Sequence, residues 1–344
     1  MNYLTFFLGL VLFSLVVLDL LFTALSPNGA GFISGRLSKG LWKTFLFLSR
    51  NLRAHRLLEM AGPLITGALL INWLVLIWAA CTIMIYSDGA SVMNMETNTP
   101  ASLISKIYFT GYTLSTMGNG DMEPGDGFWE LFTALFSFSG LILISIAISY
   151  LIPVLSAEIE KRRLSVYITT LGCSATEIIE NNWNGQDAKA LEAHFGRLTP
   201  MIIAHAQNHS AYPILNFYHT SNKKEAFALN LTNLDEAITL MLLHLSEAQR
   251  PSDAELYPLR KAISNYLITL KTAFIEETSE VPPFPDLTNF AKLNIPHAHD
   301  RSQVVRHYAQ WKKRRSTLLG LIQDDGWQWE DLDAGAYDHT FDHH

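Results

Sequence analysis

Three long apolar runs dominate the first half of the chain, and polar residues are sparse inside each of them. They are Tyr3 to Leu25, Pro63 to Tyr86 and Phe128 to Leu151. A helix needs about 20 apolar residues to cross a hydrocarbon core of about 30 Å, so each run is long enough. A cleaved signal peptide is the competing reading of the first run. No Lys or Arg precedes that run, however, and it exceeds the usual signal core of about 7–15 residues. The pattern therefore predicts three transmembrane helices, the first a retained N-terminal span at residues 1–26.

Residues 27–62, between the first two runs, combine a helical period with a basic side. Apolar and basic residues separate onto different sides when they are placed at about 100° per residue. The apolar stripe consists of Leu37, Leu41, Phe45, Leu48 and Leu52, and the basic side of Arg36, Lys39, Lys43 and Arg50. We expect an amphipathic helix lying on the membrane surface. Arg53 and Arg56 follow, with Glu59 as the single acidic residue, so the positive-inside rule makes this segment cytoplasmic.

The loops around the second and third runs give the expected orientation. Ser87 to Pro100 contains Asp88 and Glu96 but no basic residue, whereas Lys161-Arg162-Arg163 follow the third run. We therefore expect a multi-pass protein of the cell membrane, with the N-terminus outside and the C-terminal half in the cytoplasm. Asp19 lies inside the first span, where ionisable groups are costly. We expect it to reach the interface or a structural partner.

A short segment between the last two runs has the pattern of a re-entrant helix followed by a tight loop. Thr99 and Pro100 are expected as N-cap and first residue of a helix from Ala101 to about Ser115. The loop is Thr116-Met117-Gly118-Asn119-Gly120-Asp121. Its glycines stand at alternate positions and adopt backbone angles closed to other residues, so successive carbonyl oxygens can turn toward one axis. Gly-Asn-Gly-Asp is also typical of surface turns, but its place between two spans favours an ion-selectivity filter.

The expected ion-binding residues are Thr116, Met117, Gly118, Asn119 and Gly120. One chain supplies one filter strand, whereas a ring of carbonyl oxygens around an ion needs several strands related by rotation. We therefore expect a homotetramer.

The stretch from Tyr108 to Asp121 resembles the pore loop of tetrameric potassium channels. The matching residues are Tyr108, Phe109, Thr113, Ser115, Thr116, Gly118, Gly120 and Asp121. The resemblance covers about Pro63 to Leu155 and implies a pore domain at residues 63–155, with potassium ions in the filter and no other cofactor. Met117 stands where the family usually has Val or Ile, and Asn119 where it has Tyr or Phe. That aromatic ring braces the family's filter from behind, so Asn119 makes a weakly selective monovalent cation channel the first alternative.

Further pore residues are expected on both sides of the filter. Asp121, Glu123 and Asp126 would form the outer mouth and concentrate cations there. In the third span, Gly140 has a spacing after the filter similar to that of the family's hinge glycine, and Pro153 cannot donate to its helix ladder. Leu141, Ile144, Ile148 and Ile152 share one face, which we expect to line the pore and form a gate. The rival reading is that this face contacts lipid or a neighbouring helix.

The second half of the chain differs from the first in charge and in pattern. Met1 to Arg163 contains ten basic and ten acidic residues, so the totals of 25 and 32 leave 15 and 22 for the remainder, which carries the whole net charge of -7. Apolar residues recur there at helical spacing. The expected helices are Ser165 to Asn182, Asp187 to His209, Lys223 to Glu247, Ser252 to Glu277 and Arg301 to Gln323, with a loop from Thr278 to Asp300. We predict an all-helical cytoplasmic domain at residues 156–323 and an acidic mobile tail at 324–344, so that the whole protein is all-α.

The sequence contains little sign of other chemistry. Cys81 and Cys173 make no disulfide framework. His205 with His209, His297 with His299, and His339 with His343 and His344 could bind a metal, but each group lacks a fixed third ligand. No catalytic constellation and no Gly-x-Gly-x-x-Gly motif occur, and the acidic second half argues against a nucleic-acid partner. We therefore expect no enzyme activity and no bound metal.

These observations predict a homotetrameric potassium-conducting channel with a cytoplasmic regulatory domain of unidentified ligand. Its partners would be other copies of the chain, the lipid bilayer and monovalent cations. A rival from another class is a membrane-anchored signalling or scaffold protein whose pore loop does not conduct.

Overall fold

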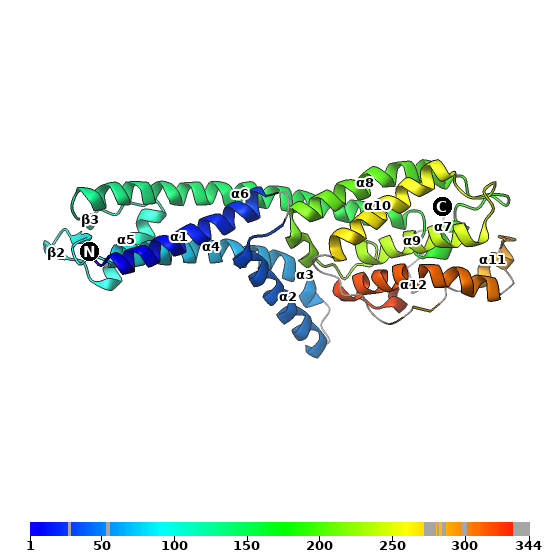
Figure 1. Ribbon diagram of the computed structural model, residues 1–344, viewed down its shortest axis with the longest axis horizontal. Coiled ribbons are helices and arrows are strands. Elements are labelled where there is room, and N and C mark those ends of the chain that lie inside the picture. The colour runs from blue at the N-terminus through cyan, green and yellow to red at the C-terminus, as the bar shows by residue number, and fades with distance from the viewer. Residues whose placement is uncertain are drawn as a thin grey trace, which may run out of the picture. The chain divides into compact units, whose positions relative to one another are not determined.

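The computed structural model describes residues 1–26, 29–52, 56–271, 280, 282–283, 287–296 and 301–332 (Figure 1). The chain divides into two compact units. The first, called here the membrane unit, comprises Met1–Phe45, Ala61–Leu155 and Ala211–Ile214. The second, the helical unit, comprises Leu46–Met60, Ser156–Ser210 and the described residues from Leu215 onward.

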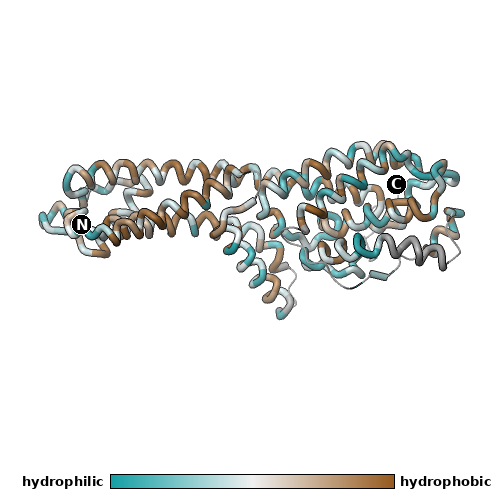
Figure 2. Tube along the Cα trace, viewed as in Figure 1, coloured by the Kyte–Doolittle hydropathy of each residue, from teal (hydrophilic) through white to brown (hydrophobic). Residues whose placement is uncertain are grey.

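Three helices among the described residues are long and apolar enough to cross a membrane, as the sequence predicts. They are α1 (Tyr3–Leu25), α4 (Ala61–Tyr86) and α6 (Gly127–Thr169). Helices α1 and α4 pack side by side and are largely apolar along their length (Figures 1 and 2). The protein is thus a helical membrane protein.

Asp19, the charged residue of α1, is buried and holds the start of helix α2 (Phe32–Leu52). Its carboxylate accepts hydrogen bonds from the amides of Ile33 (2.7 Å) and Ser34 (3.2 Å). It also accepts from the Ser34 hydroxyl at 2.5 Å and from the indole nitrogen of Trp73 on α4 at 3.1 Å. A carboxylate at a helix N-terminus satisfies amides that have no partner within the helix. Asp19 therefore has structural partners inside the membrane unit.

Helix α2 begins five residues later than the predicted amphipathic segment and is followed by the single turn α3 (Arg56–Glu59). Its buried side is formed by Ser34, Ser38 and Trp42, one helical turn apart. The predicted leucine stripe lies beside it, with Leu37 and Leu41 partly buried and Leu48 exposed.

The short helix before the loop is α5 (Leu103–Leu114), and the prediction of its start was wrong. The N-cap is Ser102, whose hydroxyl accepts from the amide of Ser105 at 3.2 Å. Thr99–Pro100 instead form strand β2 of a small antiparallel sheet in the order β2-β1-β3, with β1 at Val92–Asn94 and β3 at Met122–Pro124. Met93 pairs with Pro100 on one side and with Glu123 on the other, so the sheet joins the segments before and after α5.

Helix α6 extends well beyond the predicted end of the third span at Leu151. It continues without a break through the charged segment that follows, because those charges pair along the helix. Lys161 lies 2.8 Å and Arg162 2.9 Å from the Glu158 carboxylate, at spacings of three and four residues. The predicted helix from Ser165 to Asn182 is instead divided between the last part of α6, which ends at Thr169, and the separate helix α7 (Ala175–Glu180).

The helical unit is a bundle around one apolar core. Its helices are α7 (Ala175–Glu180), α8 (Leu191–Ala211, with its last residue in the membrane unit), α9 (Phe227–His244), α10 (Asp253–Lys271), α11 (Thr288–Lys292) and α12 (Arg301–Asp324), with 3-10 turns at Pro213–Phe217 and Trp329–Asp331. Helix α9 is central, and every residue from Phe227 to Met241 is buried. The predicted loop from Thr278 to Asp300 contains the short α11.

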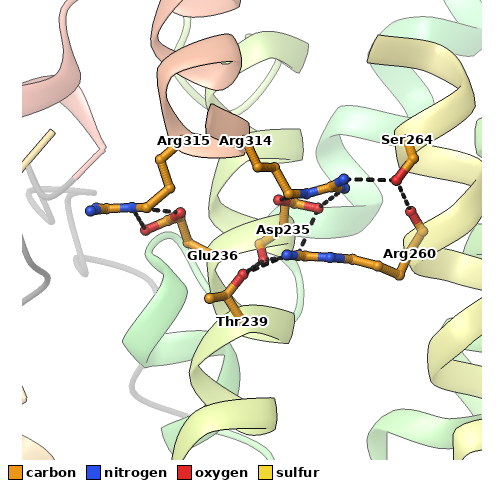
Figure 3. Close-up of polar contacts among 7 residues, drawn as sticks. All are labelled: Asp235, Glu236, Thr239, Arg260, Ser264, Arg314 and Arg315. Atoms are coloured by element: carbon orange, nitrogen blue, oxygen red, sulfur yellow. Dashed lines mark hydrogen bonds and ion pairs between the residues drawn. The ribbon is translucent and has the colours of Figure 1, made fainter. Parts of the chain in front are cut away.

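A buried network of charges joins α9 to α10 and α12 (Figure 3). Arg314 contacts both oxygens of Asp235 at 2.7 and 2.5 Å, and Arg260 lies 2.9 Å from the same carboxylate. Arg315 Nε lies 3.0 and 2.9 Å from the two oxygens of Glu236. Both carboxylates are almost fully buried, so each arginine compensates a charge that would otherwise be costly to bury.

The prediction of a mobile tail from Asp324 was wrong for the residues up to Leu332. Trp327, Trp329 and Leu332 are buried in the core of the helical unit. Lys223 also forms an ion pair with Asp331 at 2.9 Å. Apolar burial outweighs the local excess of acidic residues here. The rest of the predicted tail lies outside the described residues.

Candidate functional site

The loop after α5 has an alternating backbone conformation. The φ angles are positive at Thr116 (60°), Gly118 (59°) and Gly120 (78°), and negative at Met117 and Asn119 between them. Positive φ is accessible to glycine without strain, whereas a β-branched residue such as Thr116 adopts it at a cost. The two glycines therefore stand where the backbone requires them.

The loop is open on one side. All residues from Ser115 to Asp121 are exposed, and the Met117 side chain is 58% exposed. Within the described part of one chain, no other segment covers them. A strained, apolar-containing loop left open in this way is a candidate for contact with further copies or with a ligand.

Helix α5 is seated on α4 by specific contacts. The indole nitrogen of Trp78 donates to the Ile107 carbonyl and to the Thr110 hydroxyl, both at 3.0 Å. A Cβ on Gly111 would lie 3.1 Å from the Trp78 ring, so the helix approaches α4 closely at this glycine. These contacts fix the helix that delivers the loop.

Lys106 is a buried cation in α5 that sequence reasoning did not single out. Its ammonium donates to the carbonyl oxygens of Asp88 and of Gly89, the latter at 3.1 Å. A charged side chain in a helix that enters the membrane needs polar partners. This requirement could have identified Lys106 as a residue that anchors α5.

Two tyrosines of α5 hold the loop, and their role was also missed. The Asn119 side-chain amide donates to the Tyr108 hydroxyl. The Tyr112 hydroxyl donates to the Met122 carbonyl at 3.0 Å. The two tyrosines are four residues apart, so both project from one side of a helix toward the loop.

An open pocket of about 410 Å³ is lined by the loop, by α5 and by α6. Thr116, Gly118 and Gly120 line it on the loop side. On the α6 side it is lined by Glu130, Thr133 and Ser137, whose spacing of three and four residues places them on one face. This polar stripe inside an apolar helix is readable from the sequence and was not noted.

The other predicted pore residues occupy different environments. Asp121, Glu123 and Asp126 are all exposed next to the loop. On α6, Gly140 is buried, whereas the predicted lining face of Leu141, Ile144, Ile148 and Ile152 is 52–61% exposed. Pro153 lies inside the helix, which continues on both sides of it. The exposed face is compatible with a pore lining and equally with lipid contact.

His205 and His209 of α8 are brought together, but they lie in an aromatic environment. Their rings are 6.2 Å apart, and Phe227 and Tyr266 pack against His205 at 4.5 and 5.1 Å. Burial lowers the pKa of His205 well below its usual range and the pKa of His209 to about 4, so both are neutral at pH 7. Among the described residues, no group of three or more potential metal ligands is found. The clusters at 297–299 and 339–344 lie outside the described residues.

Comparison with known proteins agrees with the geometry of the loop and its flanking spans. Residues 72–157 match the family model described as "Ion channel". The chain is 35% identical over 329 residues to "Uncharacterized membrane protein YdjJ" of Bacillus subtilis (strain 168), across 93% of this chain and 94% of that protein. No solved structure matches the chain. The chain therefore belongs to the same family as this membrane protein along nearly its whole length, and its residues 72–157 form a pore-loop domain of the ion channel family.

Proposed function

We propose that the protein is a homotetrameric channel that conducts potassium ions through the loop Thr116 to Asp121. The observation that carries the proposal is the alternation of φ at Thr116, Gly118 and Gly120 in a loop delivered by a short helix between two spans. Such a backbone presents carbonyl oxygens that can replace the hydration shell of an ion. The exposure of the loop in one chain supports assembly with other copies around a common axis.

Electrostatics support a cation as the conducted species. The C-terminus of α5 leads directly into the loop, and a helix C-terminus carries about half a negative charge. Three exposed carboxylates lie at the end of the loop and just after it, at Asp121, Glu123 and Asp126. In the proposed orientation, with the N-terminus outside and the helical unit in the cytoplasm, these carboxylates would attract cations to the outer mouth. Ion conduction through the loop requires no catalytic residue, so we propose a channel without enzyme activity.

The test is ion flux from purified protein in liposomes. Wild type should release a potassium gradient, and Gly118→Ala should abolish the flux while the assembly persists, because the added methyl group opposes a φ of 59°. Gly89→Ala is the matched control, since a Cβ there meets nothing within 4 Å and the residue has no positive φ. Undiminished flux through Gly118→Ala would refute the filter assignment. Absence of flux from the wild type would favour the non-conducting scaffold.

The second candidate is a weakly selective monovalent cation channel, favoured by one residue. Asn119 occupies the position where potassium channels carry an aromatic ring, and its side chain is too small to fill that volume. Reversal potentials under mixed sodium and potassium separate the two candidates. A reversal potential near the potassium equilibrium value would exclude the weakly selective form.

We further propose that the helical unit regulates the pore. Helix α6 runs from Gly127 to Thr169 and contributes residues to both units. Rigid elements can transmit two-state changes between sites. Destabilising the helical unit by Asp235→Ala should change open probability but leave the permeability ratio intact, whereas the exposed Glu247→Ala should change neither. A changed permeability ratio with unaltered opening would contradict this division of roles.

A further inference from the structure

We infer that a pocket between α6 and α8 in the helical unit binds a small organic anion with an apolar body, through Arg163 and His205. The pocket has a volume of about 230 Å³, and all of its lining residues belong to the helical unit. Sites for drug-sized ligands typically measure about 300–1,000 Å³, so the ligand expected here is smaller, on the scale of a single ring. Binding at this place goes beyond ion conduction through the loop and can be measured without it.

His205 on α8 is the buried polar side chain of this pocket. It is 2% exposed, and among the described residues neither of its ring nitrogens has a hydrogen-bond partner. Buried polar groups in folded proteins almost always have a partner, because leaving one unsatisfied is costly. The ring is neutral at pH 7, since burial lowers its pKa, so it offers one N–H donor and one acceptor nitrogen. A ligand in the pocket would supply the missing partner.

Arg163 on α6 brings a positive charge to the rim of the pocket. Its two basic neighbours, Lys161 and Arg162, form ion pairs with Glu158 at 2.8 and 2.9 Å. Arg163 is exposed, and within the described part of the chain it has no carboxylate partner. A planar guanidinium can bind a carboxylate or phosphate group through two parallel hydrogen bonds. The acid group of the ligand is therefore expected at Arg163.

The rest of the pocket wall is apolar apart from one carboxylate. Leu164 is 1% exposed, whereas Pro200 and Ala204 lie at the surface. Met201 is partly buried, and its flexible side chain can adjust to a ligand. Apolar walls favour a ligand with an apolar body, because binding removes the apolar surface of both from water.

Glu160 is the carboxylate at the rim, and it makes the sign of the ligand's charge testable. Its Oε2 accepts a hydrogen bond from the Asn208 side-chain amide at 3.0 Å, so it already has a partner. It lies one helical turn before Arg163 on α6, where its negative charge opposes an anion held at that arginine. Removing the charge of Glu160 should strengthen the binding of an anion, whereas it would weaken the binding of a cation.

The experiment measures the binding of benzoate to purified full-length protein by titration calorimetry, with the same titration into detergent alone subtracted. Benzoate combines a carboxylate with one apolar ring, and benzamide and benzylamine carry the same ring with a neutral and a cationic group. We expect saturable binding of benzoate, about tenfold tighter than that of either analogue. Inorganic phosphate, an anion without an apolar body, should bind more weakly than benzoate. Tighter binding of benzylamine or of phosphate, or no saturable binding of benzoate, would overturn the inference.

Substitutions test whether benzoate occupies this pocket. Arg163→Gln should weaken binding by about tenfold, and Glu160→Gln should tighten it by about threefold. Lys261→Gln, which removes an exposed charge of α10 outside the pocket, is the matched control and should bind as wild type does. His205→Phe keeps a ring of similar shape and removes both nitrogens, so it should weaken binding by about fivefold without lowering the midpoint of thermal unfolding at pH 7. Wild-type affinity in both Arg163→Gln and His205→Phe would place the ligand elsewhere and overturn the inference.

Discussion

Gly140 of α6 lies directly against the backbone carbonyl of Leu114, the last residue of α5. A Cβ placed on Gly140 would lie 1.9 Å from that carbonyl oxygen, far inside van der Waals contact. Resemblance to potassium channels suggests a hinge at this glycine. The structure supplies a second reason for glycine here, which is the close approach of α6 to the end of the helix that delivers the filter.

Gly140→Ala should therefore disturb the filter as well as the inner helix. The methyl group would displace α5 from α6, and overpacking of this kind typically costs about 1–3 kcal/mol. We expect a lower midpoint of thermal unfolding in detergent and reduced current. Gly67→Ala in α4 is the control, because a Cβ there meets nothing within 4 Å. An unaltered Gly140→Ala protein would mean that α6 does not approach Leu114 this closely.

Asp19→Ala should release the start of α2. The substitution leaves the amides of Ile33 and Ser34 without their acceptor, at a cost of about 1–3 kcal/mol for each buried group left unsatisfied, whereas the indole of Trp73 keeps the Ser34 hydroxyl at 3.1 Å. Hydrogen exchange should accelerate at the first turn of α2. Ser14→Ala serves as control, since the Ser14 hydroxyl donates to the Leu10 carbonyl of its own helix. Unchanged exchange at Ile33 and Ser34 would contradict the capping role.

His209 should contribute a loss of stability of the helical unit in mild acid, whereas Glu236, whose pKa burial raises to about 7, contributes in the opposite direction. His209 has a pKa of about 4 when folded and 6.5 when unfolded, so between these values the unfolded chain binds more protons. Stability is then fully present above pH 6.5 and falls as the pH decreases toward 4, by about 3 kcal/mol for this residue alone. His205 adds to the same trend, because burial lowers its pKa as well. Thermal unfolding in detergent between pH 7 and pH 4 measures the effect.

His205→Phe should weaken this acid sensitivity. Among the described residues neither ring nitrogen of His205 has a hydrogen-bond partner, and its surroundings are aromatic, so an apolar ring of similar shape suits the site. We expect equal or greater stability at pH 7 and a shallower loss on acidification. His194→Phe, at a partly exposed position, controls for the exchange of rings. An unchanged pH profile in His205→Phe would show that His205 does not contribute.

Asp235→Ala should destabilise the helical unit more strongly than most single substitutions. It removes the carboxylate shared by Arg260 and Arg314, whose charges then remain buried without compensation (Figure 3). Breaking a buried pair on one side costs about 3–5 kcal/mol. Chemical unfolding followed by tryptophan fluorescence would record the loss. A variant as stable as wild type would imply that water reaches both arginines.

The spans and the filter loop could be predicted from the sequence because their signals are local. A run of about twenty apolar residues predicts a transmembrane helix, and two glycines at alternate positions predict a tight loop. Neither prediction needs to know which distant residues lie nearby. The contact between Asn119 and Tyr108 could not be found this way, since it depends on how the loop folds back on α5. The sheet was equally hidden, because strands of two or three residues such as Thr99–Pro100 are too short to show alternation.

Two further predictions were wrong because charged residues were taken to mark the end of a helix or of the folded domain. The segment from Glu158 to Arg163 stays helical because its charges pair at helical spacing, so α6 passes through it. Trp327 and Trp329 are buried although acidic residues surround them in the sequence. In both places the side-chain partners, and not the local composition, decide the structure.

The complete burial of α9 has a consequence for how the helical unit opens. Because each residue from Phe227 to Met241 is covered by other helices, no local fraying can bring its backbone amides to water. These amides should exchange with deuterium only when the whole unit unfolds. Their exchange rate therefore reports how often the helical unit unfolds. A substitution in the unit that speeds gating but leaves the exchange rate of the α9 amides unchanged must act by moving folded helices, not by unfolding them.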